Sequence, residues 1–112
     1  MLNQVVIVGR LVETPIEEKN GDGRSVTSIT LAVPRSFKNV NGEYDTDFLP
    51  VILWDGVAKS TTEYCRKGDL IGIKGRIQSR IVEKENEKKY LIEIIAEKVT
   101  FLSSTSKEKT DE

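Results

Sequence analysis

Leu70-Ile71-Gly72-Ile73-Lys74-Gly75-Arg76-Ile77-Gln78-Ser79-Arg80 is the stretch of this 112-residue chain that best indicates its fold. Side chains alternate between the two faces of a strand, which places Ile71, Ile73 and Ile77 on one side. The other side then carries Lys74, Arg76, Gln78 and Arg80. An apolar face backed by a polar one predicts a strand buried on one side only. Gly72 and Gly75, with Gly9 near the start of the chain, lie where a small barrel needs bulges or sharp coiling.

Four more strands and one helix are expected in the rest of the chain. Apolar or alternating segments predict strands at residues 4–11, 25–37, 45–54 and 89–102. Turn signals at residues 20–23 and 41–42 predict hairpins, and the charged residues 83–88 predict a mobile tip on the last hairpin. We expect the helix to begin with Asp55 as its N-cap and to end at Gly68, with Arg66 and Lys67 favouring its C-terminal end. Its apolar stripe is predicted to be Val57, Thr61 and Tyr64.

This order of elements is typical of one fold. Three strands, a short helix and two further strands make up the oligonucleotide/oligosaccharide-binding (OB) fold, in which the helix closes the barrel. We therefore predict an all-β protein, a five-stranded OB-fold barrel with one short helix between strands three and four. Residues 1–102 are expected to form this single domain. The polar residues 103–112 are expected to be a short disordered tail.

The composition argues against enzyme chemistry. The chain has no histidine and a single cysteine, Cys65, which removes histidine-dependent triads, zinc sites and internal disulfides. Asp45, Asp47 and Asp55 have no partners at a metal-ligand spacing, so we expect no metal, no cofactor and no catalytic residue. Hydrophobic residues make up 38% of the chain and charged residues 31%, without a signal peptide or a membrane-spanning apolar run. A cytoplasmic protein without membrane contact is the expectation.

Basic residues form a stripe although the formal net charge is only −1. Lys74, Arg76 and Arg80 share one face of the strand quoted above, and such a stripe can follow a phosphate backbone. The plainer interpretation is a solvated strand face, and strand parity alone favours it. The position of the aromatic residues decides between the two.

Three aromatic residues could accompany arginines on one face of the barrel. Phe37 follows Arg35, while Phe48 and Trp54 share the less aliphatic face of the third strand. Strand parity alone is equally consistent with Phe48, Ile52 and Trp54 in the core. The opposite face of that strand is a complete aliphatic set, Leu49, Val51 and Leu53, which leaves the aromatic face free to bind something flat. Aromatic platforms beside a cationic groove are what a sequence-tolerant binder of single strands needs. The remaining aromatic residues considered are expected to pack in the structure: Tyr64, Tyr90 and Phe101.

Several segments, taken in order, resemble the bacterial single-stranded DNA-binding proteins from Met1 to about Leu102. The matching segments are residues 1–11, Thr30-Leu31-Ala32-Val33 with Arg35 and Phe37, Asn41-Gly42-Glu43, Asp47-Phe48, Trp54, Glu63-Tyr64, Lys67-Gly68, and Gly75-Arg76-Ile77-Gln78-Ser79-Arg80. The resemblance implies a homotetramer of OB-fold barrels around which single-stranded DNA wraps. It also implies that Phe37, Phe48 and Trp54 stack on bases. The basic or groove-lining positions that it implies are Arg10, Arg35, Lys67, Arg76 and Arg80.

The sequence departs from the family pattern at several positions. Val82 stands where the family carries a stacking aromatic residue, Pro50 replaces a polar or basic one, and Asp55-Gly56 replaces a pair that is often basic. Each change is expected to weaken binding. Longer members end in an acidic tip that recruits replication and repair enzymes, so the chain resembles a short form that lacks this tip.

The leading hypothesis is a protein that binds and protects single-stranded DNA irrespective of base sequence, in replication, recombination, repair or DNA uptake. The alternative is a primosome-type OB-fold module that docks replication or recombination proteins and contacts DNA weakly. An RNA-binding cold-shock-like barrel is disfavoured, because such domains are shorter and richer in aromatic residues. Apolar residues on both faces of the first strand, Val6 and Val8 against Val5 and Ile7, predict a homo-oligomer with this strand near a two-fold contact.

Overall fold

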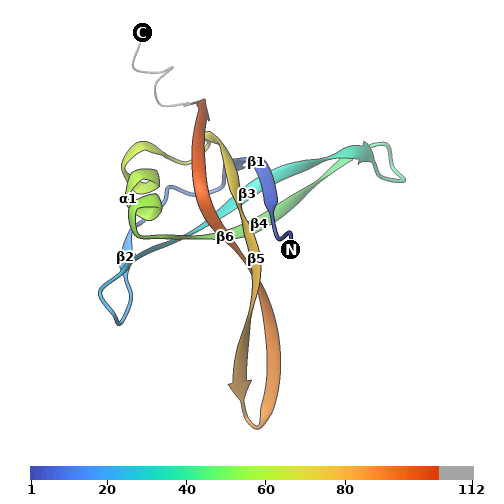
Figure 1. The fold of residues 1–112 in the computed structure, drawn as a ribbon. Coiled ribbons are helices and arrows are strands. Elements are labelled where there is room, and N and C mark those ends of the chain that lie inside the picture. Colours follow the sequence, from blue (N-terminus) through green and yellow to red (C-terminus); the bar gives the residue numbers. More distant parts are fainter. Residues whose placement is uncertain (104–112) are drawn as a thin grey trace.

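A computed structural model describes residues 1–103 of the chain, and in it one sheet closes on itself. The sheet runs in the order β1-β5-β6-β4-β3, and β3 pairs again with β1 (Figure 1). The pairing of β4 with β6 is parallel and the others are antiparallel. The strands are β1 Val5–Leu11, β3 Ser25–Lys38, β4 Tyr44–Trp54, β5 Leu70–Lys84 and β6 Glu87–Ser103, with the helix α1, Asp55–Tyr64, between β4 and β5. This is the five-stranded OB-fold barrel that the sequence predicts.

Two features at the ends of elements differ from the sequence expectation. A two-residue strand, β2 Glu18–Lys19, adds to the start of β3 and has no counterpart in the prediction. Ser103 ends β6 opposite Leu70, so the last strand reaches into the segment predicted as tail. The rest of that segment, residues 104–112, lies outside the described residues. Among residues 1–103, no helix is both long enough and apolar enough to cross a membrane.

The barrel core follows the predicted alternation. Ile29 and Leu31 of β3 and Val51 and Leu53 of β4 are at most 4% exposed, with Val33 and Leu49 partly buried beside them. On β5, Ile71 and Ile73 are buried, whereas Ile77 is 43% exposed. The prediction was wrong for Ile77 because β5 leaves the barrel after Gly75 and continues as an arm.

The exit of β5 from the barrel coincides with a β-bulge. Lys74 pairs with Lys98 and Gly75 with Ala96, so Glu97 has no Cα partner on β5. A Cβ atom at Gly75 would lie 2.0 Å from the carbonyl oxygen of Ile95, which leaves room only for glycine. The sequence prediction of a barrel bulge is thus confirmed at Gly75. Extra residues of this kind bend a strand and increase its twist.

The helix α1 starts and ends differently from the prediction. Trp54 is the N-cap residue and makes no side-chain cap bond, while Asp55 is the first helical residue with φ 50°. The predicted Asp55 cap was wrong because its carboxylate instead bonds Arg24. The helix ends at Tyr64, so Arg66 and Lys67 lie beyond it, and the left-handed Gly68 belongs to the following turn.

The buried stripe of α1 is also shifted from the prediction. Ala58 and Thr61 are buried, as is Cys65 directly after the helix, whereas Tyr64 is 64% exposed. Tyr64 and Phe101 contact each other, with ring centroids 5.9 Å apart, but both are about half exposed or more. Tyr90 is 69% exposed, so the expectation that it packs within this chain was wrong.

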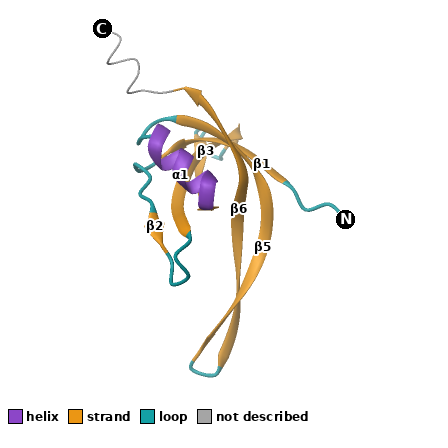
Figure 2. Ribbon diagram, turned by 60° about the vertical axis from the view of Figure 1, so that its left-hand side comes forward, coloured by secondary structure: helices purple, strands orange, loops and turns teal. Residues whose placement is uncertain are grey.

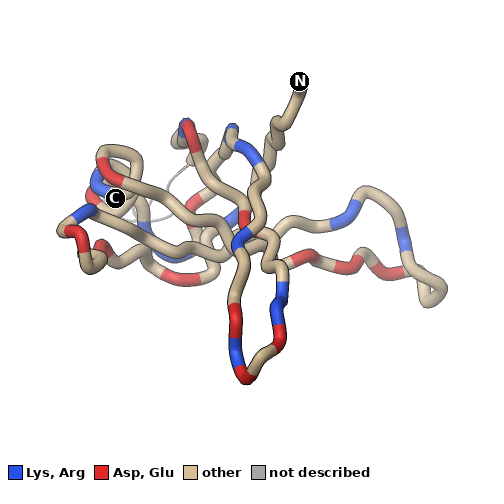
Figure 3. The backbone as a smooth tube through the Cα atoms, turned by 60° about the horizontal axis from the view of Figure 1, so that its bottom comes forward, with Lys and Arg blue, Asp and Glu red and all other residues tan. Residues whose placement is uncertain are grey.

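Two long hairpin arms, β3–β4 and β5–β6, project from the barrel (Figure 1), and the β5–β6 arm also extends below the barrel in Figure 2. The β3–β4 arm carries cations on one strand and carboxylates on the other (Figure 3). The β5–β6 arm is longer than predicted, because Glu83 pairs with Lys88 and Lys84 with Glu87. Its turn consists of residues 85 and 86 alone, both in the left-handed region, as a tight two-residue hairpin turn requires.

Candidate nucleic-acid interface

The outer face of β4 presents the two central aromatic residues. Phe48 is 62% exposed and Trp54 is half-buried, with Pro50 and Ile52 between them on the same face. The neighbouring residues of β3 are small or β-branched: Val26 opposite Trp54, Ser28 opposite Ile52, Thr30 opposite Pro50 and Ala32 opposite Phe48. Because Ala32 and Thr30 are small or β-branched, no large β3 side chain stands opposite Phe48. The structure therefore turns the aromatic face outward, as the complete aliphatic set on the opposite face of this strand predicts.

The β5–β6 arm forms a wall beside this face. A hollow of about 230 Å³ lies between the strands, with Pro50 and Ile52 at its floor and Leu91 and Glu93 on the arm. Its full lining is Ser28, Pro50, Ile52, Leu91, Ile92, Glu93 and Ile94. The parallel pairing of β4 with β6 places the arm here, because Ile52 lies opposite Ile95. Face and arm together make a shallow groove along the outside of the barrel.

Arg10 reaches the same outer face from the first strand. Its Cα partner on β3 is Ala32, whose partner on β4 is Phe48, so the three residues form one row across the sheet. The Arg10 guanidinium donates to the carbonyl oxygen of Gly68 at 3.1 Å. Lys67, in the same loop, is exposed, and its backbone N–H donates to the Thr14 hydroxyl at 3.0 Å.

Arg35 lies on the β3–β4 arm and is held by two carboxylates. Its guanidinium donates to Asp47 at 2.9 and 3.2 Å, and Asp45 lies 3.8 Å away. Hydrogen bonding to Arg35 lowers the pKa of the Asp47 carboxyl and raises that of Arg35 itself. Phe37, 63% exposed, lies farther out on this arm, where the β3–β4 ladder shifts register. The structure therefore places Phe37 apart from the Phe48 and Trp54 column.

The basic residues Arg76 and Arg80 of β5 belong to a chain of polar contacts that includes two carboxylates of β6. Arg76 contacts Glu97 at 3.4 Å and donates to Gln78 at 3.2 Å, and Gln78 donates to Glu93 at 3.4 Å. Arg80 closes the chain by donating to Glu93 at 3.1 Å. The sequence predicted the basic residues of this stripe but not their partners, because the carboxylates of Glu93 and Glu97 come from β6. Lys74 lies on the other side of the bulge, exposed, opposite Val6 and Lys98.

Two residues of this surface were missed by the sequence reasoning. Arg24 places its guanidinium over the Trp54 ring, 4.5 Å from the centroid, and bonds Asp55 at 2.8 and 3.3 Å. Tyr44 on the β3–β4 arm is 57% exposed with the Lys38 ammonium 5.8 Å from its ring. The parity of β3 could have indicated Arg24, because it precedes Val26 by two residues and so shares its face.

The acidic residues considered for a metal site have other partners. Asp45 and Asp47 pair with Arg35, and Asp55 pairs with Arg24, which lowers the pKa of Asp55 through its hydrogen bonds. Cys65 is buried, and burial, followed by the charge of Asp69, raises the pKa of its thiol to about 11. These groups are therefore structural in this fold.

Comparison with known proteins identifies the family. Residues 2–102 match the Single-strand binding protein family. Single-stranded DNA-binding protein B of Bacillus subtilis is 43% identical over 110 residues, which is 97% of each chain. Single-stranded DNA-binding protein 3 of Clostridium acetobutylicum is 44% identical over 103 residues, 90% of this chain and 71% of the relative. This is a family of binding proteins, so the chain is not an enzyme. The chain belongs to the single-strand binding protein family.

Proposed function

We propose that the protein binds single-stranded DNA irrespective of base sequence, with bases stacked on Phe48 and Trp54 and phosphates bound by nearby arginines. The observation that carries this proposal is the exposed aromatic column on β4, in one row with Arg10 and beside the groove under the β5–β6 arm. Relatives that match nearly the whole chain are named single-stranded DNA-binding proteins. The role that follows is to cover and protect single strands in the cytoplasm during replication, recombination, repair or uptake of DNA.

The physical basis is stacking combined with charge. Stacking of a base on an aromatic ring contributes about 1–3 kcal/mol and tolerates any base, because every base has a flat π face. The phosphate contacts fall to Arg10, Arg35, Lys67, Lys74, Arg76 and Arg80, with Phe37 as an outer platform on the β3–β4 arm. Arg35, Arg76 and Arg80 already have carboxylate partners, so a phosphate must compete with them. We therefore expect a salt dependence smaller than the number of arginines alone suggests.

Tryptophan fluorescence tests this proposal, because Trp54 is the only tryptophan. Single-stranded oligonucleotides of different base composition should quench its emission strongly, and a duplex of the same length should not. The variant Phe48→Ala should weaken binding roughly tenfold, in line with one lost stacking platform. Phe101→Ala, which removes an exposed ring away from this face, is the control. The proposal would be refuted if single-stranded oligonucleotides neither changed the Trp54 emission of the wild type nor bound to it.

The same proposal includes assembly into a homo-oligomer, most simply a tetramer. Val6 and Val8 on the outer face of β1 are 71% and 49% exposed. In the described part of the chain, residues 5–8 pair with β5 along one edge, and β1 meets β3 only at Arg10 and Leu11. An apolar strand with a free edge is a template for pairing with a second copy. Sedimentation should give an oligomer that Val6→Glu dissociates and that Ile16→Glu, at an equally exposed position, leaves intact. A monomeric wild-type protein at micromolar concentration would contradict assembly.

One observation favours the alternative, a module that docks other proteins. Ile81, Tyr90 and Ile92 lie on one face of the β5–β6 arm and are 55–75% exposed. An exposed apolar patch of this kind suits contact with a replication or recombination protein. If the Trp54 emission did not respond to single strands, this arm would become the leading candidate for the functional surface.

A further inference from the structure

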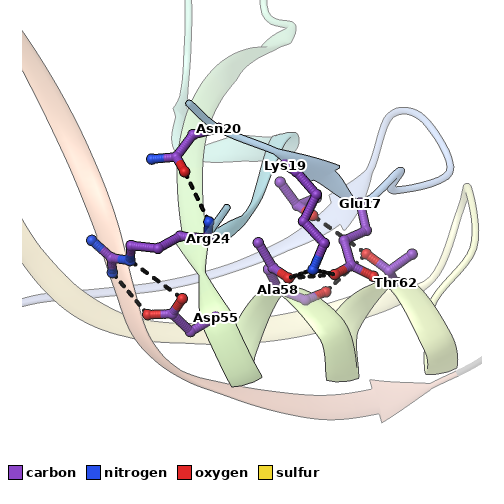
Figure 4. Close-up of polar contacts among 9 residues, drawn as sticks. Glu17, Lys19, Asn20, Arg24, Asp55, Ala58 and Thr62 are labelled. Atoms are coloured by element: carbon purple, nitrogen blue, oxygen red, sulfur yellow. Dashed lines mark hydrogen bonds and ion pairs between the residues drawn. The ribbon is translucent and has the colours of Figure 1, made fainter. Parts of the chain in front are cut away.

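The Arg24 guanidinium lies over the Trp54 ring, on which the proposed function stacks a base. The guanidinium lies 4.5 Å from the centroid of the Trp54 ring. Two hydrogen bonds to the Asp55 carboxylate, at 2.8 and 3.3 Å, hold the guanidinium in place (Figure 4). Arg24 precedes Val26 by two residues, and Val26 is the Cα partner of Trp54, so Arg24 lies on the outer face of the sheet. The guanidinium is flat and stacks on aromatic rings much as a base does. It therefore covers Trp54 on the side from which DNA would approach.

The Arg24 side chain is held over the Trp54 ring by contacts at both of its ends, and we call this covering side chain the cap. The Asn20 side-chain oxygen accepts the backbone N–H of Arg24 at 2.9 Å, which fixes the start of the side chain. At the other end, Asp55 has φ 50°, a conformation that is uncommon for a residue with a side chain but is tolerated by aspartate. Because Asp55 follows Trp54 directly, this conformation brings its carboxylate to the guanidinium that lies over the ring. The sequence departure at this position, an acidic residue where the family is often basic, thus has a structural consequence.

The cap is also weak enough to be removed. The side chains of Arg24 and Asp55 are 52% and 57% exposed, so water and salt screen their attraction. An exposed ion pair of this kind changes an equilibrium constant by only about two- to fivefold. A base that stacks on the ring gains more than this, so exchange of guanidinium for base is favourable.

We propose that Arg24 and Asp55 form a removable cap on Trp54, and that a base of single-stranded DNA takes the place of the guanidinium, which then binds a phosphate. This inference rests on the proposed function. It assigns Arg24 as a further DNA-binding residue. It assigns Asp55 as the residue that sets how much affinity is lost in opening the site.

The cap can be tested first in the absence of DNA. Asp55→Asn keeps a residue that tolerates the left-handed conformation but removes the charge that holds Arg24. We expect acrylamide to quench Trp54 more effectively in this variant than in the wild type. Asp22→Asn is the control, because Asp22 lies in the turn directly before Arg24 and acts on Arg24 through its charge alone, without a hydrogen bond. Equal accessibility of Trp54 in the wild type and in Asp55→Asn would overturn the cap.

The second test is titration with an oligothymidylate at several salt concentrations. Asp55→Asn should raise affinity about two- to fivefold, whereas Asp22→Asn should raise it less than twofold. Arg24→Gln should reduce the slope of log affinity against log salt by about one, because one phosphate contact is lost. Equal effects of the two aspartate variants, or an unchanged slope in Arg24→Gln, would overturn the inference while wild-type binding still supported the proposed function. A wild type that does not bind would refute the proposed function itself.

Discussion

Replacing Gly75 by alanine tests whether the bulge at which β5 leaves the barrel depends on the close approach of β6 to this residue. Gly75 lies directly before Arg76, at the bulge where β5 leaves the barrel. A Cβ atom at this position would lie 2.0 Å from the carbonyl oxygen of Ile95 and 3.2 Å from the Cα of Ala96. Both neighbours are backbone atoms of β6, so no side-chain rotation can relieve the overlap.

The cost follows from how far the strands must separate. Ordinary carbon–oxygen contacts between strands are about 3.3–3.6 Å, so β5 and β6 must move apart by roughly 1.3–1.6 Å at this point. Overpacking of this kind costs about 1–3 kcal/mol, and a lost buried backbone hydrogen bond costs about 1–3 kcal/mol more. We expect Gly75→Ala to lower the free energy of unfolding by about 3–5 kcal/mol, a large share of the usual total.

Gly72→Ala is the matched control on the same strand. The nearest atom to a Cβ at Gly72 is a side-chain carbon of Leu102 at 3.7 Å, an ordinary contact. Because alanine also reduces the freedom of the unfolded chain, this variant should lie within about 1 kcal/mol of the wild type.

Guanidinium chloride unfolding at one protein concentration measures both variants. The expected loss for Gly75→Ala corresponds to a midpoint lower by roughly 1 M, given the usual dependence on denaturant for a small domain. Equal midpoints for the two variants would refute the reasoning, since it depends entirely on the close approach of β6 at Gly75.

Three further predictions concern charge. Asp47→Asn should free Arg35 for phosphate and raise affinity for single-stranded DNA about two- to fivefold, while Glu43→Gln on the same arm should change it less; filter binding at fixed salt compares them. Because Arg35 and Arg24 hold the pKa values of Asp47 and Asp55 below the ordinary 3.8, these carboxylates stabilise the fold above that value, and their contribution is lost as pH falls through the lowered pKa values. As pH is lowered, the urea midpoint should therefore fall less steeply in the double variant Asp47→Asn/Asp55→Asn than in the wild type. An equally steep fall of the midpoint in both proteins would contradict this. The Cys65 thiol, with its pKa raised from 9.0 to about 11, should resist a thiol reagent at pH 8 until denaturant is added, and its stabilising effect, present below pH 9, should be lost as pH rises through about 11; rapid labelling of the native protein would contradict its burial.

The sequence by itself determined the barrel and the faces of its strands. Alternation is a local property of the backbone, so it could be read for Leu49, Val51 and Leu53 against Phe48 and Trp54 without knowledge of their neighbours. The order of strands and helix then restricted the topology, because hairpin turns force neighbouring strands to pair. The segments shared with single-stranded DNA-binding proteins pointed to the family that the comparison establishes.

Only the tertiary structure decided which charges meet. Arg24 and Asp55 are 31 residues apart in the chain, and Arg76 and Glu97 are 21 apart. Their contacts depend on the register of distant strands, on the bulge opposite Gly75 and on the left-handed conformation of Asp55. None of these is visible in local periodicity, which is why Asp55 was predicted as a cap and the carboxylate partners of Arg76 and Arg80 were not predicted. Periodicity reports which face a side chain occupies, whereas pairing of charges requires coordinates from strands that folding brings together.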